Sequence, residues 1–285
     1  MTQSMTGYGK TIVQLPQKKV TIEIKSLNSK NLDLNVRIPA AYKEKELVIR
    51  KNLSSHLVRG KVEFSIYIEV TGEETTTVIN KAVVHNYIDQ LRDIAVTSAE
   101  STLEIAMRLP DALKVEKAEL NEKEWQSIEA GIEQAIEKII TYRKDEGQVL
   151  MNDFLDRIGT IQNLADDVIK IDNDRMVYVR EKLHKAVNDL KADVDENRFE
   201  QELMYYLEKL DITEEKVRLN NHLDYFIKEL KGEGSNGKKL GFIGQEIGRE
   251  INTLGSKSNF APMQKVVVQM KDELEKIKEQ LLNVL

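Results

Sequence analysis

The long proline-free stretch in the middle of the chain most strongly limits how it can fold. No proline occurs between Pro110 and Pro262, so nothing in this stretch forces a helix to break. Within it, apolar side chains recur every three or four residues, at Leu150, Phe154, Ile158, Ile161, Leu164 and Val168. This spacing predicts long amphipathic helices, which usually form hairpins or pack against other subunits.

The first third of the chain has a different period. Apolar and polar residues alternate in three runs, at 20–24, 32–38 and 62–70, with a helical segment expected at 42–57. Alternation of this kind is typical of strands that bury one face in a mostly antiparallel sheet. We therefore predict an α+β protein with three regions: an N-terminal α+β domain at 1–120, a long helical hairpin region at 121–195, and a helical C-terminal domain at 196–285.

The C-terminal segment carries a narrow apolar seam. Its members are spaced four, four, three and four apart, at Val266, Met270, Leu274, Ile277 and Leu281. Such a seam predicts that this helix packs against a partner helix.

Composition sets the broad class. The chain has 285 residues and no cysteine, which excludes disulfides, thiol nucleophiles and cysteine-bound zinc. No apolar run approaches the ~18 to 20 residues of a membrane span, so we expect a cytoplasmic protein without membrane contact. The net charge is −6, yet residues 1–70 hold 12 Lys and Arg against 6 Asp and Glu. This basic region suits a polyanion bound locally, although chance fluctuation in a charge-rich chain would also produce it.

The glycine-rich segment 231–239, KGEGSNGKK, nearly matches two nucleotide-binding patterns. Both patterns require a strand before the loop, whereas the residues before this segment have helical spacing. We therefore interpret it as a loop between two helices.

Two helices flanking that loop carry the densest chemistry. Asp211, Glu215, Arg218 and His222 are spaced four, three and four apart, and Glu246 and Glu250 are four apart with Arg249 between them. An antiparallel pair would bring these faces together. Carboxylates with one imidazole could hold Mg²⁺ or Mn²⁺. Alternatively, Arg218 and Arg249 could neutralise the acids in an interhelical salt-bridge network.

The residues around the two glutamates favour phosphate recognition. Polar groups lie close by in sequence, at Gln245, Asn252, Ser256 and Lys257. Three glycines, Gly244, Gly248 and Gly255, each cost a helix ~1 kcal/mol relative to alanine. They indicate close approach of another backbone or of a ligand.

The N-terminal region offers a second candidate surface. The segment 4–9, SMTGYG, is too small and polar to be expected in a core, and cations lie on or beside the strands. A sheet face or edge with cations and a tyrosine could hold single-stranded RNA, although a plain solvated face would look similar.

Several blocks resemble the YicC/YloC family of bacterial endoribonucleases: SMTGYG, SLNSKNLDLNVRIP, RGKVEF, LEKLDITEEKVRLNNHLDYF and GKKLGFIGQEIGREINTLGSK. The resemblance spans the chain and implies a divalent-metal-dependent endoribonuclease that assembles as a hexamer. Many motif positions carry over, namely Gly7, Gly9, Asn28, Asp33, Arg59, Gly60, Lys61, His222, Gln245, Glu246, Arg249, Glu250, Asn252, Thr253, Ser256 and Lys257. Ser29, Gly241 and Gly248 depart from the family pattern.

From these observations we predict a metal-dependent endoribonuclease that cleaves single-stranded or hairpin RNA. The predicted metal ligands for Mn²⁺ or Mg²⁺ are His222, Glu246 and Glu250, with Glu215 or Asp211 able to complete the shell. The predicted catalytic residues are these three ligands with Arg249 and Lys257. The predicted RNA-binding residues are Tyr8, Asn28, Lys30, Arg37, Arg59, Lys61, Arg218, Asn252 and Ser256.

Three alternatives remain open at this stage. His222 could act without metal as a general base on the ribose 2′-hydroxyl. The protein could also be a non-catalytic adaptor that presents RNA to another nuclease. A third possibility is a helical scaffold whose only role is assembly.

Overall fold

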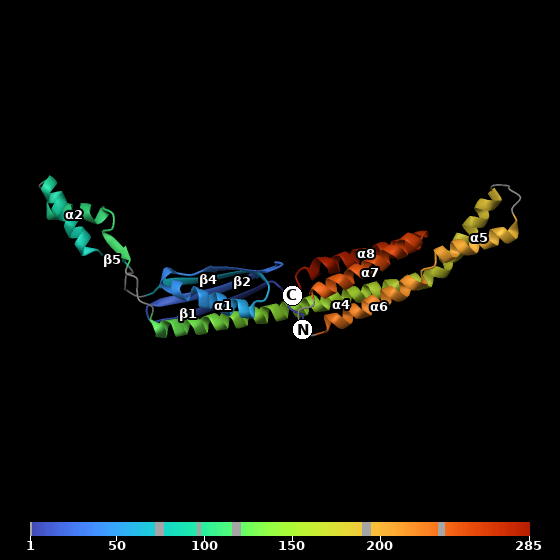
Figure 1. The fold of residues 1–285 in the computed structure, drawn as a ribbon, viewed down its shortest axis with the longest axis horizontal. Helices are drawn as coiled ribbons and strands as arrows, with labels where there is room; N and C mark the ends of the chain where they lie inside the picture. The colour runs from blue at the N-terminus through green and yellow to red at the C-terminus, as the bar shows by residue number, and fades with distance from the viewer. Residues whose placement is uncertain (1, 72–76, 96–97, 116–120, 190–194, 233–236) are drawn as a thin grey trace.

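One helix, α4 (Glu122–Asp189), runs through most of the molecule and carries a different partner on each half (Figure 1). A computed structural model describes residues 2–71, 77–95, 98–115, 121–189, 195–232 and 237–285. It confirms the α+β class, with a four-stranded sheet on the first half of α4 and a helical bundle on the second. Both chain termini lie near the middle, where the halves meet (Figure 1).

Three of the four strands of the sheet correspond to the three alternating runs, and β1 precedes them. Its strands are β1 (Gly7–Gln14), β2 (Lys18–Leu27), β3 (Leu32–Arg37) and β4 (Gly60–Val70), in the order β1-β2-β4-β3. The pairs β1–β2 and β2–β4 are antiparallel, whereas β3 pairs with β4 in parallel. This parallel pair is possible because η1 (Ala40–Lys45) and α1 (Glu46–His56) supply the crossover between β3 and β4.

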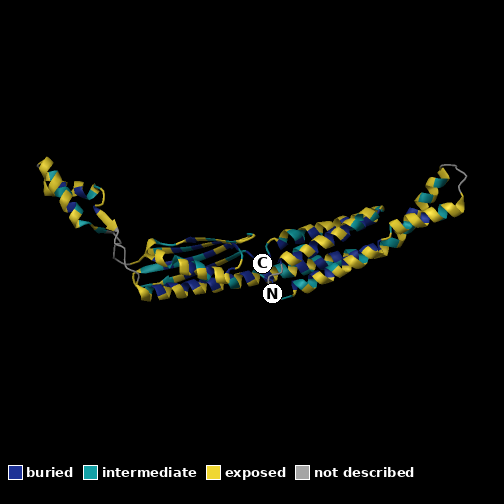
Figure 2. Ribbon diagram, viewed as in Figure 1, coloured by how far each residue is buried: buried dark blue, intermediate teal, exposed yellow. Residues whose placement is uncertain are grey.

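One face of the sheet forms the N-terminal core. Ile22 and Phe64 are fully buried there against Leu53 of α1 and Ile132 of α4. Since α1 and α4 both cover this face, the alternate side chains point to the opposite, open face. Figure 2 shows the same division along each strand.

The prediction that the segment 4–9 lies outside the core is wrong for Ser4, Met5 and Gly9, which are buried, whereas Tyr8 is 39% exposed. Ser4 and Met5 are 0% and 1% exposed, because α4 lies directly against them and against β1. The small residues permit this contact: a Cβ added to Gly9 would lie 2.2 Å from the carbonyl oxygen of Ala135. The smallness of this segment therefore serves close packing of a strand on a helix.

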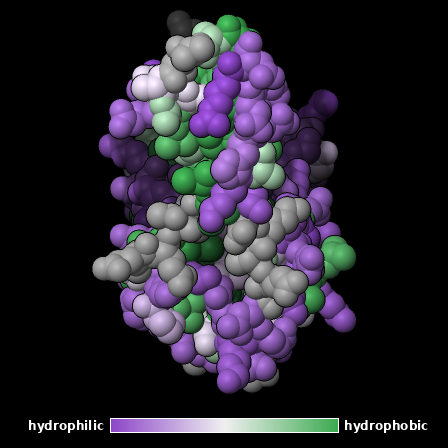
Figure 3. Space-filling model, turned by 90° about the vertical axis from the view of Figure 1, so that its left-hand side faces the viewer, coloured by the Kyte–Doolittle hydropathy of each residue, from purple (hydrophilic) through white to green (hydrophobic). Residues whose placement is uncertain are grey.

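A small separate unit projects from the N-terminal end. It comprises β5 (Thr77–Ile79), α2 (Lys81–Ile94), α3 (Ala99–Arg108) and β6 (Leu113–Val115). Its core is small, centred on Val84, Ala106 and Ala112. Figure 3 views the molecule from this end, where apolar side chains lie among hydrophilic ones at the surface.

The region 121–195, predicted as a helical hairpin, contains one continuous helix, α4, and the chain turns back only after it. After α4, the chain turns back through α5 (Glu196–Lys209), α6 (Thr213–Leu230), α7 (Gly237–Lys257) and α8 (Ala261–Leu281). Local signals set two of the starts. The Asp195 side chain accepts hydrogen bonds from Asn197 N and Arg198 N to cap α5, and Pro262 lies in the first turn of α8.

The C-terminal core lies between α4, α6, α7 and α8. The predicted seam of α8 is buried here at Met270, Leu274 and Ile277, so its partner helices belong to the same chain. The glycine-rich segment follows the end of α6 as predicted, although residues 233–236 lie outside the described part. No helix in the described ranges combines the length and apolarity needed to cross a bilayer.

The chain ends join the two halves. Ser4 and Val284 form an antiparallel β-bridge, and Leu285 N donates to Gln3 O at 2.9 Å. The start of α7 is tied to the same place, since Gly237 N donates to Leu285 O at 3.1 Å. The first residues therefore pass between α4 and the C-terminus.

Two glycines of α4 test this packing. A Cβ at Gly147 would lie 2.2 Å from Thr2 O, whereas a Cβ at Gly159 meets nothing within 4 Å. We expect Gly147→Ala to lower the free energy of unfolding by roughly 1 to 3 kcal/mol through overpacking. Gly159→Ala should raise it by about 1 kcal/mol through helix propensity. Urea denaturation of both variants checks this, and stabilisation by Gly147→Ala would contradict the close contact.

Candidate functional site

Helices α6 and α7 form an antiparallel pair joined by an ion pair near each end. Lys257 Nζ lies 2.7 Å from Glu215 Oε1, and Lys239 Nζ lies 2.8 Å from Glu229 Oε1. These two contacts set the register of the pair, that is, which residue of α6 lies opposite which residue of α7. Four of the five predicted catalytic residues lie between these contacts along the helices, namely His222, Glu246, Arg249 and Glu250, whereas Lys257 forms one of the contacts itself.

His222 and Glu250 lie at the same level of this pair. Each is seven residues inward from the Glu215–Lys257 contact, and positions seven apart lie on nearly the same face of an α-helix. Glu250 is 5% exposed and His222 is half-buried. This placement is consistent with the prediction that the two helices bring an imidazole and a carboxylate to one seam.

The acids of α7 have no counter-ion within the described chain. Glu246, one turn from Glu250, is exposed, and neither carboxylate accepts a hydrogen bond or ion pair from any described residue. Arg218 instead pairs with Glu214 four residues before it on α6. The exposed Arg249 side chain is also without a partner among the described residues. The salt-bridge network considered above is therefore not formed.

The Glu250 side chain is 5% exposed, yet its carboxylate oxygens are not among the buried atoms that lack a partner. They therefore keep contact with solvent and are open to a cation. Within the described ranges, no group of three or more His, Asp and Glu side chains is arranged to hold a metal ion. Mg²⁺, however, is commonly held by one or two carboxylates, with water and substrate phosphate completing its shell. Glu246 and Glu250, one turn apart on α7, are the carboxylates available for such a partial set, and His222 would add a nitrogen ligand.

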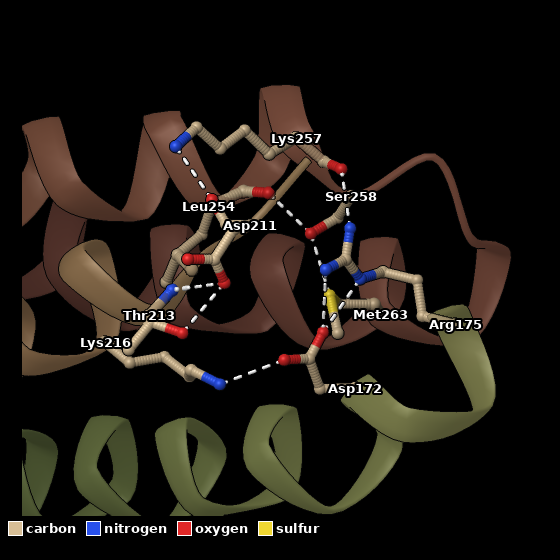
Figure 4. Close-up of polar contacts among 9 residues, drawn as sticks. All are labelled: Asp172, Arg175, Asp211, Thr213, Lys216, Leu254, Lys257, Ser258 and Met263. Atoms are coloured by element: carbon tan, nitrogen blue, oxygen red, sulfur yellow. Dashed lines mark hydrogen bonds and ion pairs between the residues drawn. The ribbon is translucent and has the colours of Figure 1, made fainter. Parts of the chain in front are cut away.

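Lys257 is already engaged by its own chain (Figure 4). Its Nζ donates to Asp211 O at 2.8 Å and to Glu215 Oε1 at 2.7 Å. Its backbone carbonyl accepts from Arg175 Nη1 at 3.1 Å. Lys257 therefore holds the ends of α6 and α7 together, and its ammonium is partly neutralised.

Asp211 and Glu215, suggested as further metal ligands, also have local roles. Asp211 Oδ1 accepts from Thr213 Oγ1 at 2.8 Å and from Thr213 N at 3.2 Å. The hydroxyl bond is the largest cause that lowers the pKa of Asp211. Asp211 thus orders the start of α6. Glu215 binds Lys257 through Oε1, while its buried Oε2 has no partner among the described residues.

A polar network that sequence reasoning did not identify anchors this end of the pair to α4 (Figure 4). Arg175 is 1% exposed and donates through Nε to Asp172 Oδ1 at 2.8 Å. Lys216 Nζ reaches Asp172 Oδ2 at 2.9 Å. The available signal was the i,i+3 spacing of Asp172 and Arg175 within an otherwise apolar stripe.

The remaining predicted RNA-binding residues of this half lie on helix surfaces. Arg218, Asn252 and Ser256 are exposed. Ser256 Oγ donates to Thr253 O at 2.9 Å within its own helix. Asn252 lies on the same solvent face of α7 as Arg249, one turn further along.

Four of the N-terminal RNA-binding candidates come together at one end of the sheet. They lie in the two adjacent loops 28–31 and 57–60 or directly beside them: Asn28, Lys30, Arg59 and Lys61. Arg59 Nε donates to Ser29 O at 2.9 Å, and Leu27 pairs with Lys61 in the sheet. We call these four residues the basic loop pair. The amide of Asn28 donates to Leu282 O, so the basic loop pair lies where the two halves meet.

Tyr8 and Arg37 lie apart from that cluster. They project from β1 and β3, the two edge strands, on the open face of the sheet. Tyr8 Oη donates to Glu23 Oε1 at 3.2 Å. Arg37 lines a depression of about 40 Å³ with Lys25 and Tyr67 among its neighbours. The predicted RNA-binding residues therefore fall into three groups.

Comparisons with known proteins agree with the resemblance in the motifs. Family models described as "Endoribonuclease YicC-like, N-terminal region" and "Endoribonuclease YicC-like, C-terminal" match residues 2–152 and 168–285. A probable endoribonuclease YicC from Clostridioides difficile (strain 630) is 32% identical over 293 residues, covering all of both chains. A probable endoribonuclease YicC from Haemophilus influenzae is 28% identical, again over the whole of both chains. The chain belongs to the family of YicC-like endoribonucleases.

Proposed function

We propose that this protein is an endoribonuclease that cleaves single-stranded or hairpin RNA at the seam of α6 and α7. The observation that supports this most is Glu250, whose carboxylate oxygens reach solvent and have no hydrogen-bond donor or counter-ion among the described residues. It lies level with His222, and the unpaired Arg249 lies beside it. The names of the relatives support the same activity.

Each of these side chains has a suitable chemical role. Arg249 is exposed and unpaired, so its guanidinium can bind phosphate oxygens in a bidentate manner. The His222 imidazole is a candidate general base or acid. Carboxylates alone would repel RNA, so a cation at Glu250 would assist phosphate binding. A divalent ion held by Glu250, His222 and Glu246 would supply charge stabilisation and a more acidic water.

Two chemical routes remain, and the product ends distinguish them. Attack by the 2′-hydroxyl, with His222 as base, leaves a 2′,3′-cyclic phosphate. Attack by an activated water leaves a 5′-phosphate and a 3′-hydroxyl. Metal dependence and the choice of Mn²⁺ or Mg²⁺ stay predictions, as does a cytoplasmic location.

Substitution of the seam residues tests the activity. We expect Glu250→Ala and His222→Ala to reduce cleavage of labelled RNA by at least about 100-fold, and EDTA to do the same until Mn²⁺ or Mg²⁺ is added back. Glu275→Ala is the matched control, since Glu275 is an exposed glutamate on α8 paired with Lys278. If Glu250→Ala cleaves as well as the control, the site is elsewhere or a contaminant is responsible. Tight binding without cleavage would favour the adaptor.

The basic loop pair gives a separate prediction about RNA binding. For single strands, each lost phosphate contact lowers the slope of log affinity against log salt by about 0.7. We expect Arg59→Ala and Lys61→Ala each to weaken RNA binding and to lower this slope by about that amount. Lys265→Ala, an exposed lysine on α8, should leave the slope unchanged. Anisotropy titrations over a range of KCl concentrations measure it, and unchanged slopes in both loop variants would exclude these contacts.

We also propose assembly into a hexamer, as the family resemblance implies. Large apolar side chains exposed in the single chain support association: Leu47, Ile94, Met204 and Val268. Sedimentation equilibrium should give six times the chain mass. A monomer at micromolar concentration would contradict this.

A further inference from the structure

Arg143 is a buried arginine in the part of α4 that supports the sheet. It follows Ile136 and Ile139 at helical spacing, in the apolar stripe, and is 2% exposed. Its Nη2 donates to Met5 O and to Arg59 O, both at 3.2 Å, and to the hydroxyl of Ser26. These acceptors belong to three separate segments, so the guanidinium links three pieces of chain to α4.

The charge of Arg143 has no compensating carboxylate. No ion pair to it is formed within the described ranges, and its Nε is buried without a hydrogen-bond partner. Burial lowers the pKa of Arg143. An apolar side chain of similar length would fill the stripe without this desolvation penalty. Core packing therefore does not account for an arginine here.

The contact with Arg59 shows what the charge organises. The Arg59 carbonyl precedes Gly60, whose φ of +118° favours glycine at this turn. Gly60 N donates to Asn31 O at 3.4 Å, and Arg59 Nε donates to Ser29 O at 2.9 Å. Arg143 thus fixes the Arg59 carbonyl, which lies next to both basic side chains, Arg59 and Lys61. Because the Arg59 side chain donates to Ser29 O, the same contact also holds loop 28–31.

We propose that Arg143 is a positioning residue for RNA binding, which holds the basic loop pair in the arrangement that meets the RNA backbone. The inference rests on the proposed function, since RNA is the ligand. Two effects act together. The Nη2 group fixes the Arg59–Gly60 turn through the Arg59 carbonyl, and the uncompensated charge raises the positive potential beneath the loops.

A double-mutant cycle separates this role from a merely structural one. Arg143→Met is made in the wild type and in the Arg59→Ala/Lys61→Ala variant. Each full-length protein is titrated against a fluorescent single-stranded RNA with 2′-O-methyl groups, in EDTA so that it is not cleaved, over a range of KCl. Thermal unfolding is measured on the same samples. Arg157→Met is the control, because Arg157 lies on the same helix but pairs with Asp153 and Glu273 in the helical half.

We expect Arg143→Met to weaken binding roughly tenfold in the wild type and to lower the salt slope by about 1.4, equal to two single-strand phosphate contacts. In the loop variant it should change affinity by less than about twofold, since the contacts it positions are already gone. Arg143→Lys, which keeps the charge on a shorter side chain whose ammonium does not reach the position of Nη2, should lie between wild type and Arg143→Met. Arg157→Met should shift the unfolding temperature alone.

Two results would overturn the inference. Equal losses of affinity in both backgrounds, together with a lower unfolding temperature, would show that Arg143 only stabilises the fold. A wild-type salt slope in both Arg143→Met and Arg143→Lys would show that the loops are positioned without it. Failure of the wild type itself to bind RNA is distinct from both, because it removes the proposed function and this inference with it.

Discussion

The contact between α4 and the N-terminal segment is the constraint on which the two-part architecture depends. Gly9 lets β1 approach the backbone of α4, and Gly147 lets residue Thr2 pass across it. Side chains at either position would push the strand or the chain end away from the helix. Because the same helix continues into the C-terminal core through Phe154 and Ile158, these close contacts join both halves to one support.

The termini complete this junction. The bridge between Ser4 and Val284 places the end of α8 against the first residues, and Gly237 at the start of α7 is tied to Leu285. Asn28 of the basic loop pair contacts the same end of α8. From Gly237 to Glu250 is 13 residues of helix, or about 20 Å at 1.5 Å per residue. The first 13 residues of α7 thus connect the junction of the two halves, where the basic loop pair lies, with the level of Glu250 in the α6/α7 seam.

Much of this arrangement could be predicted from sequence, because it depends on periodicity. Alternation gave the strands and their buried faces, and three-and-four spacing gave the helices. The same spacing predicts that His222 and Glu250 face each other across the α6/α7 pair, and the level of the two residues in the structure is consistent with this. What could not be predicted depends on which partner a flexible side chain takes. Arg218 binds Glu214 on its own helix, since a partner one turn away costs less ordering than one across a seam.

The segment 4–9 and Arg143 show a second limit. Small polar residues were interpreted as surface, yet they are buried because a helix passes close to them. Arg143 was not identified because one arginine interrupts a stripe that otherwise reads as core. Periodicity does not show that Met5 near the chain end and the turn at Arg59 supply hydrogen-bond acceptors to this arginine.

The buried charges of the described chain divide in a way that relates these sites. Four charged side chains are buried: Arg143, Arg175, Glu215 and Glu250. Arg175 and Glu215 each have an opposite charge, Asp172 and Lys257, and both hold helix ends together. Arg143 and Glu250 have none among the described residues. A paired buried charge can be understood from the fold that it braces. Arg143 is different, because its Nε is buried without a partner and its charge carries a desolvation penalty beneath the basic loops. The carboxylate of Glu250 still reaches solvent in the α6/α7 seam, so each half keeps one unpaired charge, but only that of Arg143 has a buried polar atom without a hydrogen bond.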